Sequence, residues 1–109
     1  MPGLSRPLYQ IKADFFKTLG HPIRIRVLEL LSQREHTVSE MLTEIGVEAA
    51  NLSQQLSILR RAGLVTARRA GLSVTYELTT PQVAELLAAA RAILTRVAAG
   101  QVEALEQPA

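Results

Sequence analysis

The stretch from Glu48 to Ala62 collects side chains that can read the edges of DNA bases. Leu52, Leu56 and Leu59 share one side of a helical wheel, and the rest of the surface carries amides, hydroxyls and arginines, with no carboxylate after Glu48. Amides can bond adenine bidentately, hydroxyls can bond a base or a phosphate, and isoleucine can touch a thymine methyl. The alternative is a polar surface helix that happens to lack acids. The candidate base readers are Ala50, Asn51, Ser53, Gln54, Gln55, Ser57 and Ile58.

Arginines gather at the end of this stretch and just after it. Between Ala49 and Tyr76 the sequence has four arginines and no acidic residue, a charge of +4, whereas the whole chain carries only +2. A local basic stripe is the electrostatic footprint of a phosphate-binding surface. We therefore expect phosphate contacts from Arg60, Arg61, Arg68 and Arg69.

Apolar spacing and capping residues predict the helices that must position these groups. We expect helices over residues 8–19, 22–32, 38–45 and 48–62. Gly20 ends the first, Pro22 opens the second, and Thr37 with Glu40 forms a capping box at the third. Gly46 stops the third helix before a brief turn. Two short helices joined by such a turn, the second with a base-reading face, indicate a helix-turn-helix.

Two strand-like runs, 64–70 and 73–79, follow the fourth helix. Gly71 and Leu72 lie between them and suit a type II′ turn. That loop predicts the pairs Val65–Leu78, Ala67–Tyr76 and Arg68–Thr75. The apolar residues then share one face, while Arg68 and Thr75 lie on the other, with Arg69 near the tip. A basic hairpin in this place favours a wing that contacts the DNA backbone or a minor groove, over a hairpin that only covers the core.

The last helix is expected to begin after Thr80 and to run from Pro81 to about Ala99. Its apolar stripe is broader than a small core needs, so we expect part of it to pack on a second copy of the chain. The first helix, with its adjacent phenylalanines, is either core or subunit interface. Residues 1–7 are expected to be a flexible arm and residues 100–109 a frayed tail. The expected dimer interface comprises Leu8, Ile11, Phe15, Val83, Leu86, Leu87, Ala90, Ile93, Leu94 and Val97.

The composition excludes several classes of protein. A chain of 109 residues with 48% apolar residues suits one domain, and the lack of cysteine removes thiolate metal sites and disulfides, as in a cytoplasmic protein. There is no apolar run long enough to cross a membrane and no signal-peptide core. No nucleophile–base set, glycine-rich phosphate loop or paired carboxylates are visible, so we do not expect an enzyme.

The segments FFKTLGHPIRIRVLELL and TVSEMLTEIGVEAANLSQQLSILRRAGLVTARRAGLSVTYELT resemble the ArsR/SmtB family of small bacterial winged-helix repressors. The resemblance covers roughly residues 8–93. It implies a mostly α fold with a β-hairpin, a winged helix-turn-helix in the order of four helices, two strands and a fifth helix. It also implies a homodimer through the first and last helices, an inverted-repeat operator in double-stranded DNA and, in many members, release of DNA when an effector binds.

The sequence departs from this family at the usual effector sites. Members that sense soft metals commonly carry a cysteine pair in the helix before the recognition helix, and residues 38–47 have no cysteine here. Others carry Asp and His ligands on the last helix, where this chain has only the carboxylate of Glu85. No cofactor is therefore expected. Two alternatives stay open: a nickel or zinc site built from His21, His36 or carboxylates across the dimer, and a winged-helix module that binds another protein.

Overall fold

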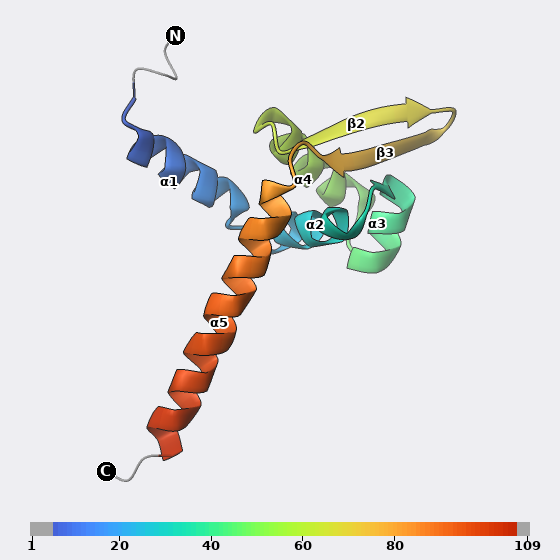
Figure 1. Ribbon diagram of the computed structural model, residues 1–109. Coiled ribbons are helices and arrows are strands. Elements are labelled where there is room, and N and C mark those ends of the chain that lie inside the picture. Colours follow the sequence, from blue (N-terminus) through green and yellow to red (C-terminus); the bar gives the residue numbers. More distant parts are fainter. Residues whose placement is uncertain (1–5, 107–109) are drawn as a thin grey trace.

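The computed structural model describes residues 6–106 as five helices and a small sheet (Figure 1). The elements are, in chain order, α1 (Leu8–Leu19), α2 (Pro22–Gln33), β1 (His36–Thr37), α3 (Val38–Ile45), α4 (Ala49–Arg61), β2 (Val65–Ala70), β3 (Ser73–Leu78) and α5 (Gln82–Glu106). Figure 1 shows α2, α3, α4 and the sheet gathered into one body, from which α1 and α5 project. Most of the expected arm at residues 1–7 lies outside the described residues, and Arg6 pairs with Asp14 at 2.7 Å.

The first four helices begin and end within one residue of their expected bounds. The capping box at α3 is confirmed, because Thr37 Oγ1 accepts from the Glu40 amide at 3.1 Å and Glu40 Oε1 accepts from the Thr37 amide at 2.8 Å. Gly46 ends α3 in the left-handed region with φ 73°. Gly20 also ends its helix, but with φ −78°, so α1 lacks the left-handed cap that its glycine suggested.

The sheet has three antiparallel strands in the order β1–β3–β2, one more than the sequence predicted. The expected hairpin register is confirmed in all three pairs, and Gly71 has the positive φ of 61° that the first turn position needs. The additional strand β1 pairs His36 with Tyr76 and Thr37 with Thr75. Two residues are too few to show an alternating pattern, which is why the sequence did not reveal this strand.

The core lies between α2, α3, α4 and the sheet. Its largest fully buried side chains include Leu28, Met41 and the three leucines of the α4 stripe. The first turn of α5 adds Val83, which is 4% exposed. Burying each such side chain contributes about 1.5–3 kcal/mol, so the apolar side of α4 determines which of its faces points outward. Within the described residues, no helix is long and apolar enough to cross a membrane.

Helix α5 continues to Glu106, beyond its expected end near Ala99. Residues 100–106 of the expected tail thus belong to α5, and residues 107–109 lie outside the described residues. Among the described glycines, positive φ occurs at Gly46, Gly63 and Gly71 and not at Gly100, so Gly100 does not act as a helix end. The surrounding alanines have the highest helix propensity and offset the cost of about 1 kcal/mol for an interior glycine.

Candidate DNA-binding interface

Helix α4 presents most of the predicted base readers on one accessible surface. Its leucine stripe is buried, and the opposite side is open to solvent. Ile58, at the edge of this surface, is half-buried. The exposed candidates on α4 are Ala50, Asn51, Ser53, Gln54, Ser57, Arg60 and Arg61.

Gln55 departs from the prediction that it reads bases, because its side chain is turned into the protein and only 6% exposed. Its Oε1 accepts from Arg24 Nη1 at 2.9 Å, and its Nε2 donates to Asn51 Oδ1 at 3.2 Å. At 100° per residue Gln55 lies about 60° from Leu52, so it borders the buried stripe and meets α2. The sequence placed it on a flank, but the position of α2, which covers that flank, is not visible in the periodicity of α4.

The basic residues at the end of α4 and on the hairpin lie in different surroundings. Arg60 and Arg61 are exposed in the last turn of α4, where Arg61 Nε donates to the Ser57 carbonyl at 3.4 Å. Ser57, Arg60 and Arg61 line a shallow depression on the surface. Arg69 is exposed near the hairpin tip. These arginines can approach a phosphate without breaking an ion pair within the described residues.

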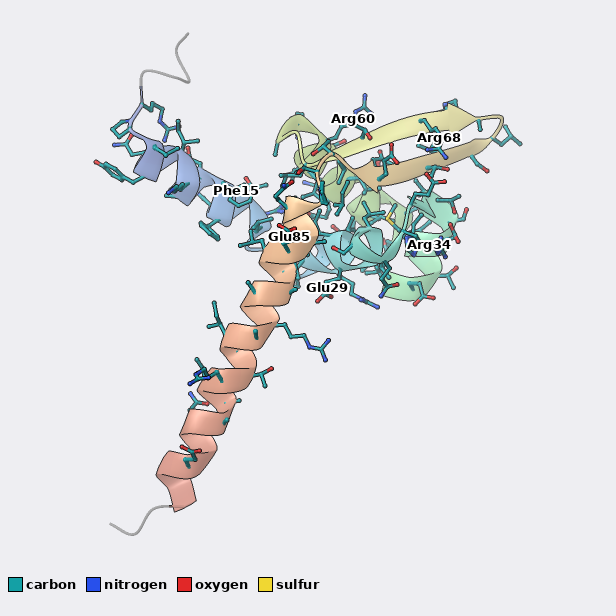
Figure 2. The ribbon with its side chains drawn as sticks, in the orientation of Figure 1. Phe15, Glu29, Arg34, Arg60, Arg68 and Glu85 are labelled. Carbon is teal, nitrogen blue, oxygen red and sulfur yellow. The ribbon has the colours of Figure 1, made fainter. Side chains whose placement is uncertain are left out.

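Arg68 is held by a carboxylate that sequence reasoning missed. Its Nη2 and Nη1 lie 2.8 and 2.9 Å from the Oε1 and Oε2 atoms of Glu35, which makes the pair bidentate (Arg68 is labelled in Figure 2). The Arg68 guanidinium lowers the pKa of Glu35, and Glu35 in turn raises the pKa of Arg68. The unpredicted strand β1 explains the pair. Thr75 of β3 lies between Thr37 of β1 and Arg68 of β2, so the long side chain of Arg68 crosses β3 to reach Glu35, which lies just before β1. Thr75 is accordingly only half exposed.

A second ion pair joins this edge of the sheet to α3. Arg34 Nη2 lies 3.0 Å from Glu40 Oε2, the same carboxylate that completes the capping box (Arg34 is labelled in Figure 2). The hydrogen bond from Arg34, followed by that from the Thr37 amide, lowers the pKa of Glu40 to about 2. Both groups are exposed to solvent, so the pair orients the start of α3 more than it stabilises the fold.

The two histidines have structural partners within one copy of the chain. His21 Nδ1 accepts from the Ile23 amide at 3.1 Å and caps α2. His36 is 3% exposed on β1, and its Nδ1 donates to the Arg34 carbonyl at 2.9 Å. In the part of the chain that the structure describes, no three or more His, Asp or Glu side chains come together as ligands would.

The predicted dimer residues divide into two groups. Val83 is part of the core of a single copy, and Phe15, Leu86 and Leu87 pack partly against that core, since the first turns of α5 lie on α2. Val83 was therefore misassigned: it is buried within one copy and is not available to a second. Ile11 is half-buried and Ala90 exposed. The large apolar side chains that a single copy leaves exposed include Leu8, Ile93, Leu94 and Val97. Phe16, one of the two adjacent phenylalanines, is also exposed, as is Tyr9, which was not among the residues expected at an interface.

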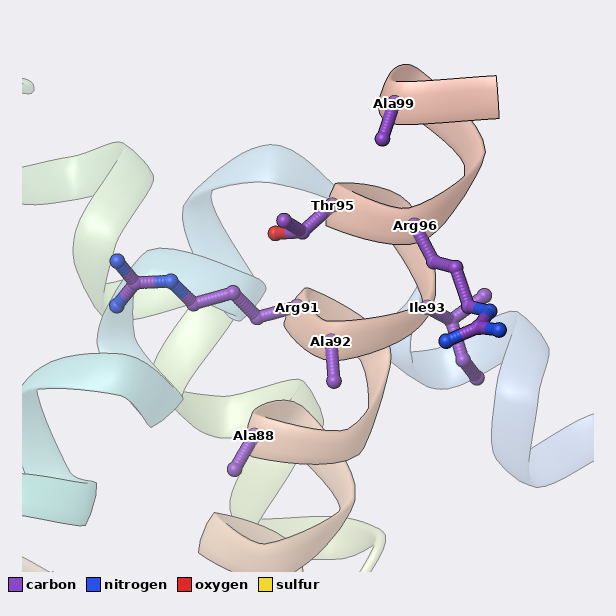
Figure 3. A pocket seen from close by; sticks show the side chains of 7 residues that line it. All are labelled: Ala88, Arg91, Ala92, Ile93, Thr95, Arg96 and Ala99. Carbon is purple, nitrogen blue, oxygen red and sulfur yellow. The ribbon is translucent and has the colours of Figure 1, made fainter. Parts of the chain in front are cut away.

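The exposed part of α5 combines small, apolar and basic residues. Figure 3 shows Ile93 on the same side of the helix as Arg96, whereas Arg91 leaves the opposite side. Between the end of α1 and the starts of α2 and α5 lies an almost wholly apolar groove that includes Phe16, Ile25 and Leu86. Exposed large apolar side chains on both projecting helices, α1 and α5, are typical of a surface that contacts another molecule.

Known proteins are similar to this chain in both sequence and fold. The family model described as "Bacterial regulatory protein, arsR family" matches residues 21–67. The uncharacterised HTH-type transcriptional regulator Rv0081 of Mycobacterium tuberculosis is 55% identical over 94% of this chain and 90% of its own length. Its crystal structure superposes with a TM-score of 0.82, covering 89% of this chain and 98% of that one.

More distant relatives carry functional names. The biofilm growth-associated repressor of Xylella fastidiosa is 39% identical over 69% of this chain and 66% of its own length. The structure of the transcriptional repressor BigR from that species has a TM-score of 0.74 at 36% identity, covering 78% of this chain and 87% of that one. A homodimeric winged helix-turn-helix DNA-binding domain from Mycobacterium bovis, solved by NMR, has a TM-score of 0.71 at 32% identity, covering 81% of this chain and 82% of that one.

The chain belongs to the arsR family of bacterial regulatory proteins. It is a DNA-binding transcriptional regulator with a winged helix-turn-helix fold, and it is not an enzyme. The resemblance found in the sequence is thereby confirmed.

Proposed function

We propose that this protein is a repressor that binds an inverted-repeat operator in double-stranded DNA as a homodimer. Helix α4 of each copy lies in a major groove, and the β2–β3 hairpin contacts the backbone. The observation that carries the proposal is the exposed, carboxylate-free surface of α4 from Ala50 to Arg61. Its amides and hydroxyls suit base edges, and the arginines at its end suit phosphates.

The dimer is supported by the apolar surface of α1 and α5. Ile93, Leu94 and Val97 are 62%, 66% and 49% exposed in a single copy. A second copy related by a two-fold axis would cover them, and two-fold symmetry in the protein calls for an inverted repeat in the DNA. The relative from Mycobacterium bovis is named as a homodimer, and the relative from Xylella fastidiosa is named as a repressor.

Selection of bound fragments from the source genome tests the proposal. The purified wild-type protein should enrich fragments that share one inverted repeat. The variant Gln54→Ala should lose about 1–3 kcal/mol on that site and show a relaxed base preference, because an exposed amide that bonds a base edge is removed. Gln33→Ala, which removes an exposed amide at the end of α2, is the matched control and should bind like the wild type.

The same experiment separates DNA binding from the alternative of a protein-interaction module. An interaction module predicts that the wild type enriches no common sequence and that Gln54→Ala equals Gln33→Ala. Enrichment of a single half-site, without its inverted copy, would contradict the dimeric part of the proposal alone.

A further inference from the structure

A chain of three side chains joins α2 to the outer surface of α4. Arg24 Nη1 donates to Gln55 Oε1 at 2.9 Å, and Gln55 Nε2 donates to Asn51 Oδ1 at 3.2 Å. Arg24 is itself held, because its Nε donates to the Thr18 carbonyl at the end of α1 at 2.7 Å. These hydrogen bonds thus connect the half-buried backbone carbonyl of Thr18, at the end of α1, to the exposed residue Asn51 of α4.

The chemistry of arginine determines the direction of every bond in this chain. A guanidinium can only donate hydrogen bonds, so the atom of Gln55 that faces it must be the carbonyl oxygen. The amide nitrogen of Gln55 then faces Asn51 and can only donate, so Asn51 must turn its own oxygen inward. The orientation of both amides follows from this requirement and does not depend on distinguishing oxygen from nitrogen by their positions alone. The opposite orientation of Gln55 would set two donors against each other at a buried site.

This arrangement determines which hydrogen-bonding group Asn51 presents at the surface. Its oxygen already has a partner in Gln55, whereas its amide group, with two hydrogens, is uncommitted within the described residues. In the major groove guanine offers two acceptors and thymine offers O4, whereas the exposed edge of cytosine offers only a donor. An Asn51 held in this way suits guanine or thymine better than cytosine.

We propose that Gln55 is a positioning residue that determines base specificity: held by Arg24, it makes Asn51 a hydrogen-bond donor toward the DNA. The inference rests on the proposed function, because it needs α4 in a major groove. It also gives Gln55 a different role from the direct base contact that the sequence suggested. Gln55 selects the base without touching it.

The variant Gln55→Glu should reverse the direction of the hydrogen bond between residue 55 and Asn51. A carboxylate only accepts, so it can accept from Arg24 with one oxygen and from Asn51 Nδ2 with the other. Asn51 would then turn its oxygen outward and become an acceptor. The preferred base at its position should change from guanine or thymine to cytosine or adenine, whose exposed amino groups donate. We expect a change in relative affinity on the order of tenfold.

The experiment is selection from random-sequence DNA with the wild type and four variants. Asn51→Ala identifies the base position that Asn51 contacts, because preference there should be lost. Gln55→Glu should switch the preference at that position, and Arg24→Lys should retain the wild-type preference, because lysine also only donates. Gln33→Glu makes the same chemical change at an exposed position that takes no part in these hydrogen bonds, and it should retain the wild-type base preference at every position of the site. A Gln55→Glu variant that keeps the wild-type preference would overturn the inference.

Two further results keep this test separate from that of the proposed function. If the wild type selects no sequence at all, the proposed function fails and the base-reading role fails with it. If the wild type selects a sequence and Gln55→Glu does not switch it, only the inference fails. In the free wild-type protein, the side-chain amide hydrogens of Gln55 should exchange with water more slowly than those of the exposed Gln54, as measured by NMR. Equal exchange would contradict the bond to Asn51, whether or not the variant folds.

Discussion

Helices α4 and α5 carry similar apolar stripes in very different surroundings. Leu52, Leu56 and Leu59 of α4 are at most 2% exposed, whereas Ile93 and Leu94 of α5 are 62% and 66% exposed. Figure 1 shows the reason: α4 lies within the body of the molecule, and most of α5 extends away from it. A helical pattern reveals that a face will be covered, but it does not reveal whether the same copy of the chain covers it.

This difference separates two tasks. The covered stripe of α4 holds its opposite surface in a single orientation, which a base-reading surface requires. The uncovered stripe of α5 leaves apolar area available for a second copy, which would set the distance between two α4 helices. The predictions below test this separation, beginning with the change expected to have the largest effect.

Charges introduced on the uncovered stripe should separate the two copies. In the double variant Ile93→Glu and Leu94→Glu, four carboxylates would meet in a dimer interface, so we expect monomers in sedimentation. Affinity for a full inverted repeat should fall by about 100-fold or more, because binding to two linked half-sites is lost. Ser39→Glu, an exposed change on α3, should stay dimeric. A double variant that remains a dimer would show that the interface lies elsewhere.

Shortening one leucine in each stripe should affect stability in different ways. Leu56→Ala leaves a cavity in the core and should lower the free energy of unfolding by about 2–5 kcal/mol at every protein concentration. Leu94→Ala should lower only the part of the stability that rises with protein concentration, because that part comes from association. Denaturant unfolding over a wide concentration range measures both effects. If both variants lowered the free energy of unfolding by the same amount at every protein concentration, the proposed difference between α4 and α5 would be wrong.

The ion pair between Arg68 and Glu35 allows a test on the hairpin, with a smaller expected effect. Arg68→Ala should weaken binding to all DNA sequences alike and reduce the slope of log affinity against log salt by about one unit, since one phosphate contact is lost. Glu35→Gln removes the competing carboxylate and should leave the slope intact or steeper. Fluorescence titrations at several salt concentrations measure these slopes. An unchanged slope in Arg68→Ala would refute a phosphate contact by Arg68.

The smallest expected effect concerns acid stability at α3. The pKa of Glu40 is lowered to about 2 by Arg34 and the Thr37 amide, against an ordinary value of 4.5. Because folding lowers this pKa, the ionised Glu40 carboxylate stabilises the folded state. This stabilisation is complete above about pH 4.5 and is lost as pH falls toward 2. Glu40→Gln should therefore show a shallower loss of stability across that window in denaturant unfolding. Parallel pH profiles for the two proteins would argue against the role of Glu40.

Local signals predicted most of this fold, and long-range neighbours account for what they missed. The bounds of the first four helices, the capping box of Thr37 and Glu40 and the hairpin register depend on residues close in sequence, and these were predicted, whereas the end of α5 was not. Strand β1 is too short to leave a pattern, and without it the contact of Glu35 with Arg68 was not foreseen. The burial of Gln55 depends on α2, and that of Val83 on how the start of α5 meets the body. The accessible surface of α4 was predicted because it is the complement of its own stripe.

Footprinting of the DNA upstream of the protein's own coding sequence tests the central claim most directly. The claim predicts two protected segments, related as an inverted repeat and centred about one helical turn, roughly 34 Å, apart. The double variant at Ile93 and Leu94 should lose both segments together at the same protein concentration. Protection of a single segment, or no protection beyond that of unrelated DNA, would contradict a dimer that reads an operator through α4.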